Sequence, residues 1–397
     1  MKKTTVISAI MVFVIVCMTF CGSVSAEETR VFTDDAGRVI SLPVTIDAVS
    51  PAGALAQIML YTLEPDLFVS VANVFTEEEK KYVDSRLLTL PVTGQFYGSK
   101  STMNAEEIME LNKSLGIDVI LDVGEVKSGV KEDLDTIQSQ TGVSFAFITQ
   151  NNLSDIPASY ITLGNLLGIP KRGQELAGYT ETLLAEFASG MEKVGDNKVS
   201  LIYVSIVDGN SVNLIGSGDN SYHGEVINYL GNNLAPEAVT ASGRGDAYTM
   251  EDIIQMNPEY ILVTYTKDHA YYNEIMNSSL WATLPAVQNG KVYEAPCGPY
   301  NWMGNPPSVQ RLLSMMWLGN LFYPDVFDYN INDRVKEYYS LFFGYDLTDA
   351  ELNNIMIYAK NASSPSPSSA APSPFPLGGI LAGLGVAALF AVIIRNQ

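Results

Sequence analysis

Histidine and cysteine are scarce in this chain of 397 residues, which has two histidines and three cysteines. Neither His223 nor His269 has a neighbouring set of ligand residues, and this disfavours a multi-histidine zinc or manganese site. Cys17 and Cys21 lie in an N-terminal apolar stretch that we expect to be removed, which leaves Cys297 alone. We therefore expect no internal disulfide, so the hydrophobic core must stabilise the fold.

Enzyme signatures and an excess of positive charge are also missing. The sequence contains no HExxH, CxxC, GxSxG or P-loop pattern, so we expect no catalytic residues, no bound metal and no intrinsic cofactor. The formal net charge is −21. This acidic balance disfavours nucleic acid or an anionic membrane surface as the main partner.

Both ends of the chain predict export and attachment to a membrane. Residues 1–26 have two lysines, an apolar run and a small-residue cleavage site, which indicates a secretory signal, with an uncleaved N-terminal anchor as the alternative. Residues 361–376 are rich in Ser and Pro and are typical of an extended linker. Residues 377–394 carry no charge and precede Arg395, a pattern typical of a transmembrane anchor. We expect anchoring to the outer face of the cell membrane by the C-terminus.

Four triplets match the acceptor pattern for N-glycosylation, and they begin at Asn112, Asn152, Asn277 and Asn361. In an exported protein some of these triplets can carry glycans, although such triplets also arise by chance. The sequence therefore predicts a glycoprotein without selecting the site.

The stretch 170–194 predicts one long helix in the middle of the chain. Pro170 suits a first helical turn, and Gly195 is a stop signal. The apolar residues between them follow helical spacing, at Leu176, Leu183, Leu184, Phe187 and Met191. We interpret this helix as a spine that joins a lobe of residues 27–169 to a lobe of residues 195–360.

Short apolar runs alternate with helical patterns on both sides of this spine. The runs 118–122, 144–148 and 199–206 predict strands, 131–141 predicts a helix, and 213–221 predicts a loop. Strands that alternate with helices imply a parallel sheet covered by helices on its faces. The fold class is therefore α/β, with two Rossmann-like lobes joined by one long helix.

Aromatic residues gather on predicted loops that follow strands or open helices. In open α/β sheets these loops form the ligand crevice. Aromatic rings suit a bulky, partly planar ligand, and a basic side chain can meet a ligand anion. Ordinary packing or surface solvation is the alternative for each residue alone. The candidate ligand-binding residues are Phe96, Tyr97, Tyr222, His223, Arg244, Tyr248, Tyr300 and Trp302.

Trp302 is the strongest of these candidates, because Pro299, Gly304 and Pro306 stiffen its loop. The tripeptide Arg244-Gly245-Asp246 has the form of an adhesion motif, with an ordinary turn as the alternative.

Several segments together resemble the substrate-binding proteins of ABC importers for iron complexes and cobalamin. In the first lobe these are VFTDDAGRVISLP, DAVSPAGALAQIML and MNAEEIMELNKSLGIDVILD, and in the second they are GEVINYLGNNLAPEA, YTMEDIIQMNPEYILV, LWATLPAVQNGKVYEAP and LFYPDVF. The resemblance covers residues 30–327. It implies the class III periplasmic-binding-protein fold, in which one interlobe helix permits only small closure, and a cleft tryptophan at position 302.

The same resemblance implies the function and the partners. A monomeric binding protein would capture a ferric siderophore, haem or a corrinoid and deliver this metal chelate to a permease and its ATPase. The two glutamates with which the family often docks its permease are not matched, because the corresponding places fall near Leu55 and near Asn228, one turn after Glu225. A cell-surface adhesion or structural protein on the same fold is the alternative, and an extracellular hydrolase is a third hypothesis.

Overall fold

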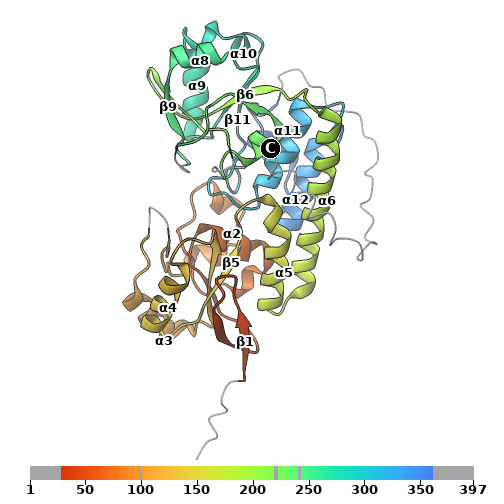
Figure 1. Cartoon of the computed structure of the whole chain (residues 1–397). Coiled ribbons are helices and arrows are strands. Elements are labelled where there is room, and N and C mark those ends of the chain that lie inside the picture. Colours follow the sequence, from red (N-terminus) through yellow and green to blue (C-terminus); the bar gives the residue numbers. More distant parts are fainter. Residues whose placement is uncertain (1–27, 98–100, 219–221, 240–242, 361–397) are drawn as a thin grey trace, which may run out of the picture.

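The computed structural model describes residues 28–97, 101–218, 222–239 and 243–360 (Figure 1). The predicted secretory signal, the Ser/Pro-rich linker and the C-terminal anchor lie outside these residues. Within the described ranges, no helix is both long enough and apolar enough to cross a membrane.

The N-terminal lobe is built on a parallel sheet of strand order β3-β4-β5. Alternate side chains of β4 serve two hydrophobic clusters, because successive residues of a strand point to opposite faces. Leu121 packs in the cluster that holds residues of α2 and α5, and Ile120 packs in the one that holds residues of α3 and α4. An antiparallel hairpin, β1-β2, precedes this sheet. The elements are β1 (Thr29–Thr33), β2 (Val39–Pro43), β3 (Val49–Pro51), α2 (Ala54–Leu63), η1 (Pro65–Leu67), η2 (Glu79–Lys81), η3 (Ser85–Thr89), α3 (Ala105–Leu115), β4 (Val119–Gly124), α4 (Val130–Thr141), β5 (Phe145–Thr149), η4 (Leu153–Asp155) and α5 (Ile156–Leu166).

The C-terminal lobe has a mixed sheet of order β11-β10-β6-β7-β9, with β8 also paired to β6. The expectation of a wholly parallel sheet is wrong here, because β7 and β9 run antiparallel to their neighbours. The loop predicted at 213–221 is also wrong at its start. Strand β7 begins at Ser211 and pairs antiparallel with β6. The elements are β6 (Ser200–Asp208), β7 (Ser211–Leu214), α7 (Glu225–Leu230), β8 (Asn232–Asn233), β9 (Asp246–Thr249), α8 (Met250–Met256), β10 (Tyr260–Val263), η5 (Lys267–His269), α9 (Ala270–Asn277), η6 (Trp281–Thr283), α10 (Pro285–Gln288) and β11 (Val292–Glu294).

The long helix α6 spans Pro170–Val194, as the sequence predicts, and runs alongside α5 (Figure 1). All five apolar residues that defined its predicted face are buried. The helices α5 and α6 meet closely through two glycines, and a Cβ atom at Gly173 would lie 2.5 Å from the backbone oxygen of Tyr160. This contact fixes the crossing of α5 and α6.

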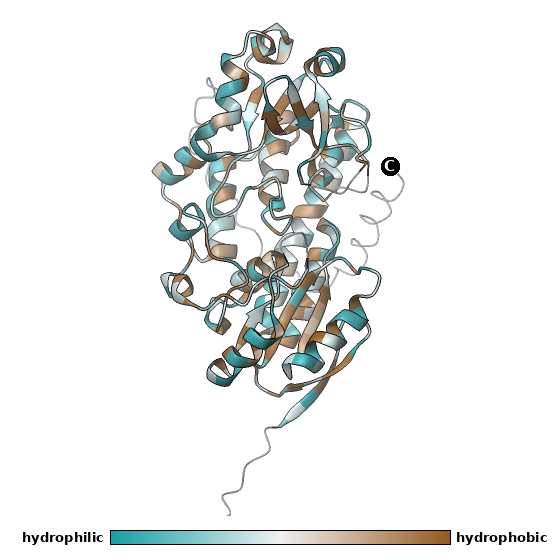
Figure 2. Ribbon diagram, turned by 90° about the vertical axis from the view of Figure 1, so that its left-hand side faces the viewer, coloured by the Kyte–Doolittle hydropathy of each residue, from teal (hydrophilic) through white to brown (hydrophobic). Residues whose placement is uncertain are grey.

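Three helices follow the C-terminal sheet: α11 (Arg311–Phe322), α12 (Ile331–Phe343) and α13 (Asp349–Ile355). Helix α12 reaches the N-terminal lobe, where the rings of Tyr61 and Phe343 lie 6.4 Å apart. On α6, Arg172 donates through Nη2 to the backbone oxygens of both Thr62 and Leu341. The two lobes therefore share a layer of helices and one continuous apolar cluster. The strands at the centre of each lobe appear brown in Figure 2, the colour of hydrophobic residues.

Candidate functional site

A buried ion pair lies where the two lobes meet. Glu225 opens α7 in the C-terminal lobe, and its Oε2 accepts a hydrogen bond from Nη1 of Arg311 on α11. Arg311 is 1% exposed, and Glu225 is 12% exposed. The other carboxylate oxygen, Oε1, accepts from the backbone N–H of Leu153 in the N-terminal lobe at 2.8 Å. One carboxylate thus joins a buried arginine to the opposite lobe.

Tyr222 makes a second connection across the same junction. Its hydroxyl donates to the carboxylate of Glu125, which follows β4 in the N-terminal lobe. Burial, together with this carboxylate, raises the pKa of Tyr222. Its backbone oxygen accepts from Nη1 of Arg311 at 3.3 Å, so the ion pair and the tyrosine form one network.

His223 lies beside this network and favours the neutral form. Burial lowers its pKa, a hydrogen bond with the backbone of Gly304 opposes that shift, and the charge of Arg311 reinforces it. Gly243 packs against the imidazole, because a Cβ atom there would lie 2.7 Å from Nε2. The chain next to Arg244 therefore approaches the junction as well.

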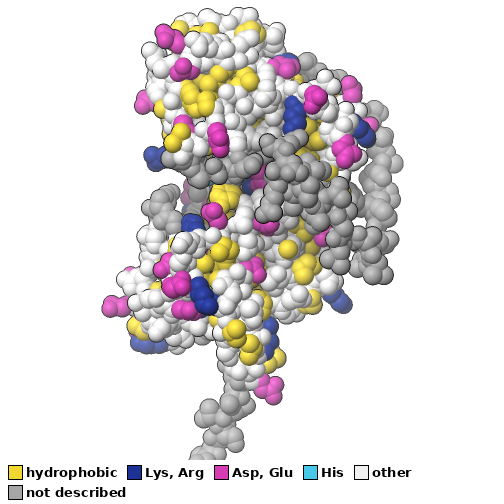
Figure 3. Space-filling view, in the orientation of Figure 1, with side chains coloured by type: hydrophobic (Ala, Val, Ile, Leu, Met, Phe, Trp, Pro, Cys, Tyr) yellow, Lys and Arg dark blue, Asp and Glu magenta, His cyan; other side chains and the backbone are white. Residues whose placement is uncertain are grey.

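Several buried polar atoms near this network have no hydrogen-bond partner among the described residues. They are the amide oxygen and nitrogen of Gln150, Oδ1 of Asn151, Oγ of Ser308 and Oε1 of Gln310. Gln150 and Asn151 directly follow β5, and Ser308 and Gln310 directly precede α11. All of these atoms are themselves buried, so within the fold they cost free energy as long as they stay unpaired. Figure 3 shows the surface hollowed between the two lobes.

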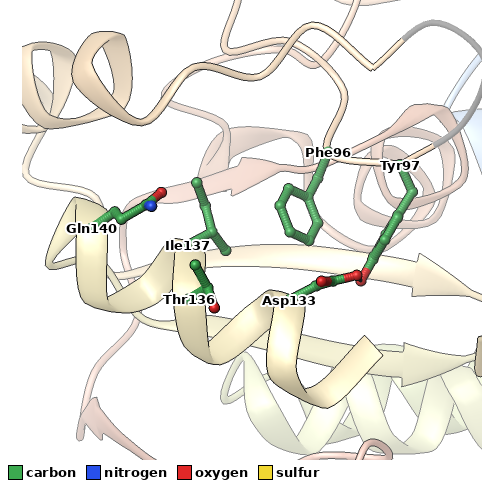
Figure 4. A pocket seen from close by; sticks show the side chains of 6 residues that line it. All are labelled: Phe96, Tyr97, Asp133, Thr136, Ile137 and Gln140. Atoms are coloured by element: carbon green, nitrogen blue, oxygen red, sulfur yellow. The ribbon is translucent and has the colours of Figure 1, made fainter. Parts of the chain in front are cut away.

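Phe96 and Tyr97 line a separate hollow of about 260 Å³ on the N-terminal lobe, against α4 (Figure 4). The two rings meet edge to face, with centroids 4.5 Å apart. The hydroxyl of Tyr97 donates to Oδ2 of Asp133 at 3.0 Å, and Lys127 lies over its ring, 5.7 Å from the centroid. Burial raises the pKa of the neighbouring Asp122 at the end of β4 to about 6, against the opposing charge of Lys127. This hollow therefore borders the carboxyl ends of the strands.

Tyr300 and Trp302 do not offer ligand-contacting surface in this structure, contrary to the sequence-based prediction. Trp302 is fully buried and donates from Nε1 to the backbone oxygen of Gly298 at 3.4 Å. Tyr300 is 4% exposed and packs against Phe343 of α12. Their loop is rigid, as the prolines predict, but it is folded into the shared apolar cluster.

Tyr248 lies in β9, and Arg244 lies in the exposed turn that precedes this strand. The backbone oxygen of Arg244 accepts from Oγ of Ser205, and Tyr248 packs on the C-terminal core. Within the adhesion-like tripeptide, the Asp246 carboxylate accepts from the backbone of Val239. Only Asp246 of the tripeptide belongs to β9, and Arg244 and Gly245 lie in the turn that precedes this strand.

The structure thus brings Tyr222 and His223 to the lobe junction and places Tyr97 near the carboxyl end of β4. The sequence reasoning missed Glu125, Glu225 and Arg311, which organise the junction. The one available signal was an arginine inside the otherwise apolar stretch 308–321, because a charged side chain in such a stretch must be paired. In the described part of the chain, no group of three or more His, Cys, Asp or Glu residues could hold a metal ion.

Comparison with known proteins identifies the fold. A family model described as periplasmic binding protein matches residues 118–297. The structure is similar to an ABC transporter solute binding protein from Sulfurospirillum deleyianum, with a TM-score of 0.72 and 25% identity over 83% of this chain and 99% of that one. The fold is the class III periplasmic-binding-protein fold. Both the matched family and this fold are those of transport components and not of enzymes.

Two further solved structures have this periplasmic-binding-protein fold. A periplasmic solute binding protein from Veillonella parvula is 24% identical, with a TM-score of 0.65 over 83% of this chain and 97% of that one. A molybdate periplasmic binding protein from Haemophilus influenzae is 18% identical, with a TM-score of 0.60 over 80% of this chain and 99% of that one. The search of curated proteins found no match.

Proposed function

We propose that this protein is the solute-binding component of an ABC importer, which captures a small molecule between its lobes and delivers it to a permease and its ATPase. The observation that carries the proposal is the likeness of the whole two-lobed fold to an ABC transporter solute binding protein, with a TM-score of 0.72 and 25% identity over 83% of this chain. A solute that contacts Tyr97 of the N-terminal lobe and Tyr222 of the C-terminal lobe would bind both lobes at once. Such a contact couples binding to the separation of the lobes.

The class of solute that we propose is a metal chelate: a ferric siderophore, haem or a corrinoid. The rings of Phe96 and Tyr97 at the rim, together with Tyr222 at the junction, supply the aromatic contacts for such a ligand. Since Trp302 is buried, these rings take the place of the tryptophan contact that the sequence predicts. Export, anchoring through residues 377–394 and a monomeric state belong to the same proposal.

Glu225 is not available to dock the permease. Its carboxylate is engaged by Arg311 and by the N–H of Leu153, so it does not extend to an arginine of a permease. The two glutamates with which the family often docks its permease are not matched in the sequence, so the docking residues of this protein stay open.

Isothermal calorimetry of the purified protein tests the proposal. The panel is a ferric catecholate, a ferric hydroxamate, haem, cobalamin and molybdate, the last being a small oxyanion outside the proposed class. We expect one chelate to bind with a 1:1 stoichiometry and Tyr222→Phe to weaken it, while Tyr248→Phe on the β9 strand leaves it unchanged. Binding of molybdate alone would replace the chelate class with an oxyanion, and failure of the whole panel would count against solute capture.

A further inference from the structure

The three glycosylation triplets in the described residues differ in how the fold presents their asparagines. Asn277 and Ser279 are exposed, and Asn277 is the last residue of α9. Among the described residues its side chain makes one hydrogen bond, from Nδ2 to the backbone oxygen of Asn273. In this part of the chain the asparagine side chain is exposed to solvent.

Asn152, in contrast, is built into the lobe junction. Its Oδ1 accepts from Oγ of Ser154, the serine of its own triplet, at 2.6 Å. Leu153 between them is buried, and its N–H donates to Glu225 of the other lobe. A glycan at Asn152 would separate these contacts.

Asn112 lies in the last turn of α3 and is half-buried. Its Oδ1 accepts from the backbone N–H of Ile117 at 2.7 Å, so its amide is held against the turn that follows the helix. The triplet that begins at Asn361 lies outside the described residues.

Helix α9 places Asn277 far from the proposed solute site. The helix starts directly after η5, at the carboxyl end of β10, and runs back along the sheet toward the amino ends of the strands. Its C-terminal end therefore lies away from the edge where the lobes meet, in the outer part of the upper lobe (Figure 1). Met276 and Leu280 beside it are 39% and 45% exposed, so a glycan here would cover apolar surface.

We propose that Asn277 is an N-glycosylation site of the exported protein. The Nδ2 atom would form a bond to C1 of the first sugar of a lipid-phosphate-linked glycan. The C1–O bond to phosphate would break, the lipid phosphate would leave, and the amide nitrogen would lose one proton. The inference rests on the export that is part of the proposed function.

Glycopeptide mass spectrometry of the full chain, purified from its own source, tests this inference. We expect glycan on the peptide that contains Asn277 and none on the peptide that contains Asn152. Asn277→Gln and Ser279→Ala should each abolish the modification, because both destroy the triplet. Ser278→Ala changes the neighbouring serine, leaves the triplet intact and should retain the glycan.

Thermal unfolding of each variant checks that the fold is kept. An unmodified Asn277 in a protein that has lost its N-terminal leader would overturn the inference while leaving the solute-binding proposal intact. A glycan on Asn152 with none on Asn277 would also overturn it, because the exposed triplet would then not be the one that is modified. A chain that retains its leader inside the cell would overturn both the inference and the proposed location.

Discussion

Replacing Glu225 with glutamine should strongly destabilise the lobe junction. The amide can still accept the hydrogen bond from the N–H of Leu153, but it leaves the charge of Arg311 buried and unpaired at 1% exposure. Removing one partner of a buried pair typically costs about 3–5 kcal/mol. We therefore expect Glu225→Gln to lower the free energy of unfolding by about 3 kcal/mol or more.

Urea denaturation followed by circular dichroism measures this loss. The matched control is Glu251→Gln in the exposed first turn of α8, which should change stability by less than about 0.5 kcal/mol. Replacing both Glu225 with Gln and Arg311 with Met removes the unpaired charge, so it should recover much of the loss. A loss below about 1 kcal/mol in Glu225→Gln would refute the reasoning, since the pair would then be solvated.

Three further predictions concern a buried carboxyl, a helix crossing and a buried ring. Burial raises the pKa of Asp122 from 3.8 to about 6, so the native state binds the proton more tightly and stability should fall as pH rises from about 4 to 6. Asp122→Asn should remove that fall and be more stable by up to about 3 kcal/mol at pH 7, and an unchanged pH slope in urea titrations would contradict this. Gly173→Ala should lower stability by about 1–3 kcal/mol, because its Cβ would meet the backbone oxygen of Tyr160. Gly178→Ala, which meets nothing within 4 Å on the same helix, should raise it by up to about 1 kcal/mol, and equal melting temperatures for the two variants would be inconsistent with this. Trp302→Ala should cost about 3–5 kcal/mol in urea denaturation, whereas a loss of affinity at constant stability would place the ring in the cleft after all.

The fold followed from local signals where one pattern dominated. The helix at 170–194 has a proline at its start, a glycine after its end and a regular apolar face, and its predicted bounds match α6. The hairpin β6–β7 was missed because the predicted strand ended at 206 and the predicted loop began at 213, whereas the turn of Gly209 and Asn210 reverses the chain between two paired strands. Helix α12 could not be assigned to the N-terminal lobe from sequence, since that contact joins residues 282 positions apart.

The candidate site was less accessible from sequence than the fold. Aromatic residues on loops predict Tyr97 and Tyr222 as candidates, and both lie near the lobe junction, but the loop pattern does not tell which rings are covered. We predicted Trp302 as a ligand contact because its loop is stiff. The same stiff loop holds the indole ring in the core, where it is fully buried. The pairing of Glu225 with Arg311 spans 86 positions, so no local pattern indicates it.

Native mass spectrometry of the protein purified from its own source addresses the solute-capture account most directly. The account predicts one small molecule held noncovalently per chain, with the mass of a metal chelate, and less of it in Tyr222→Phe than in Tyr248→Phe. A chain that carries no solute in its native state, and that acquires none from an extract of its growth medium, would contradict solute capture between the lobes.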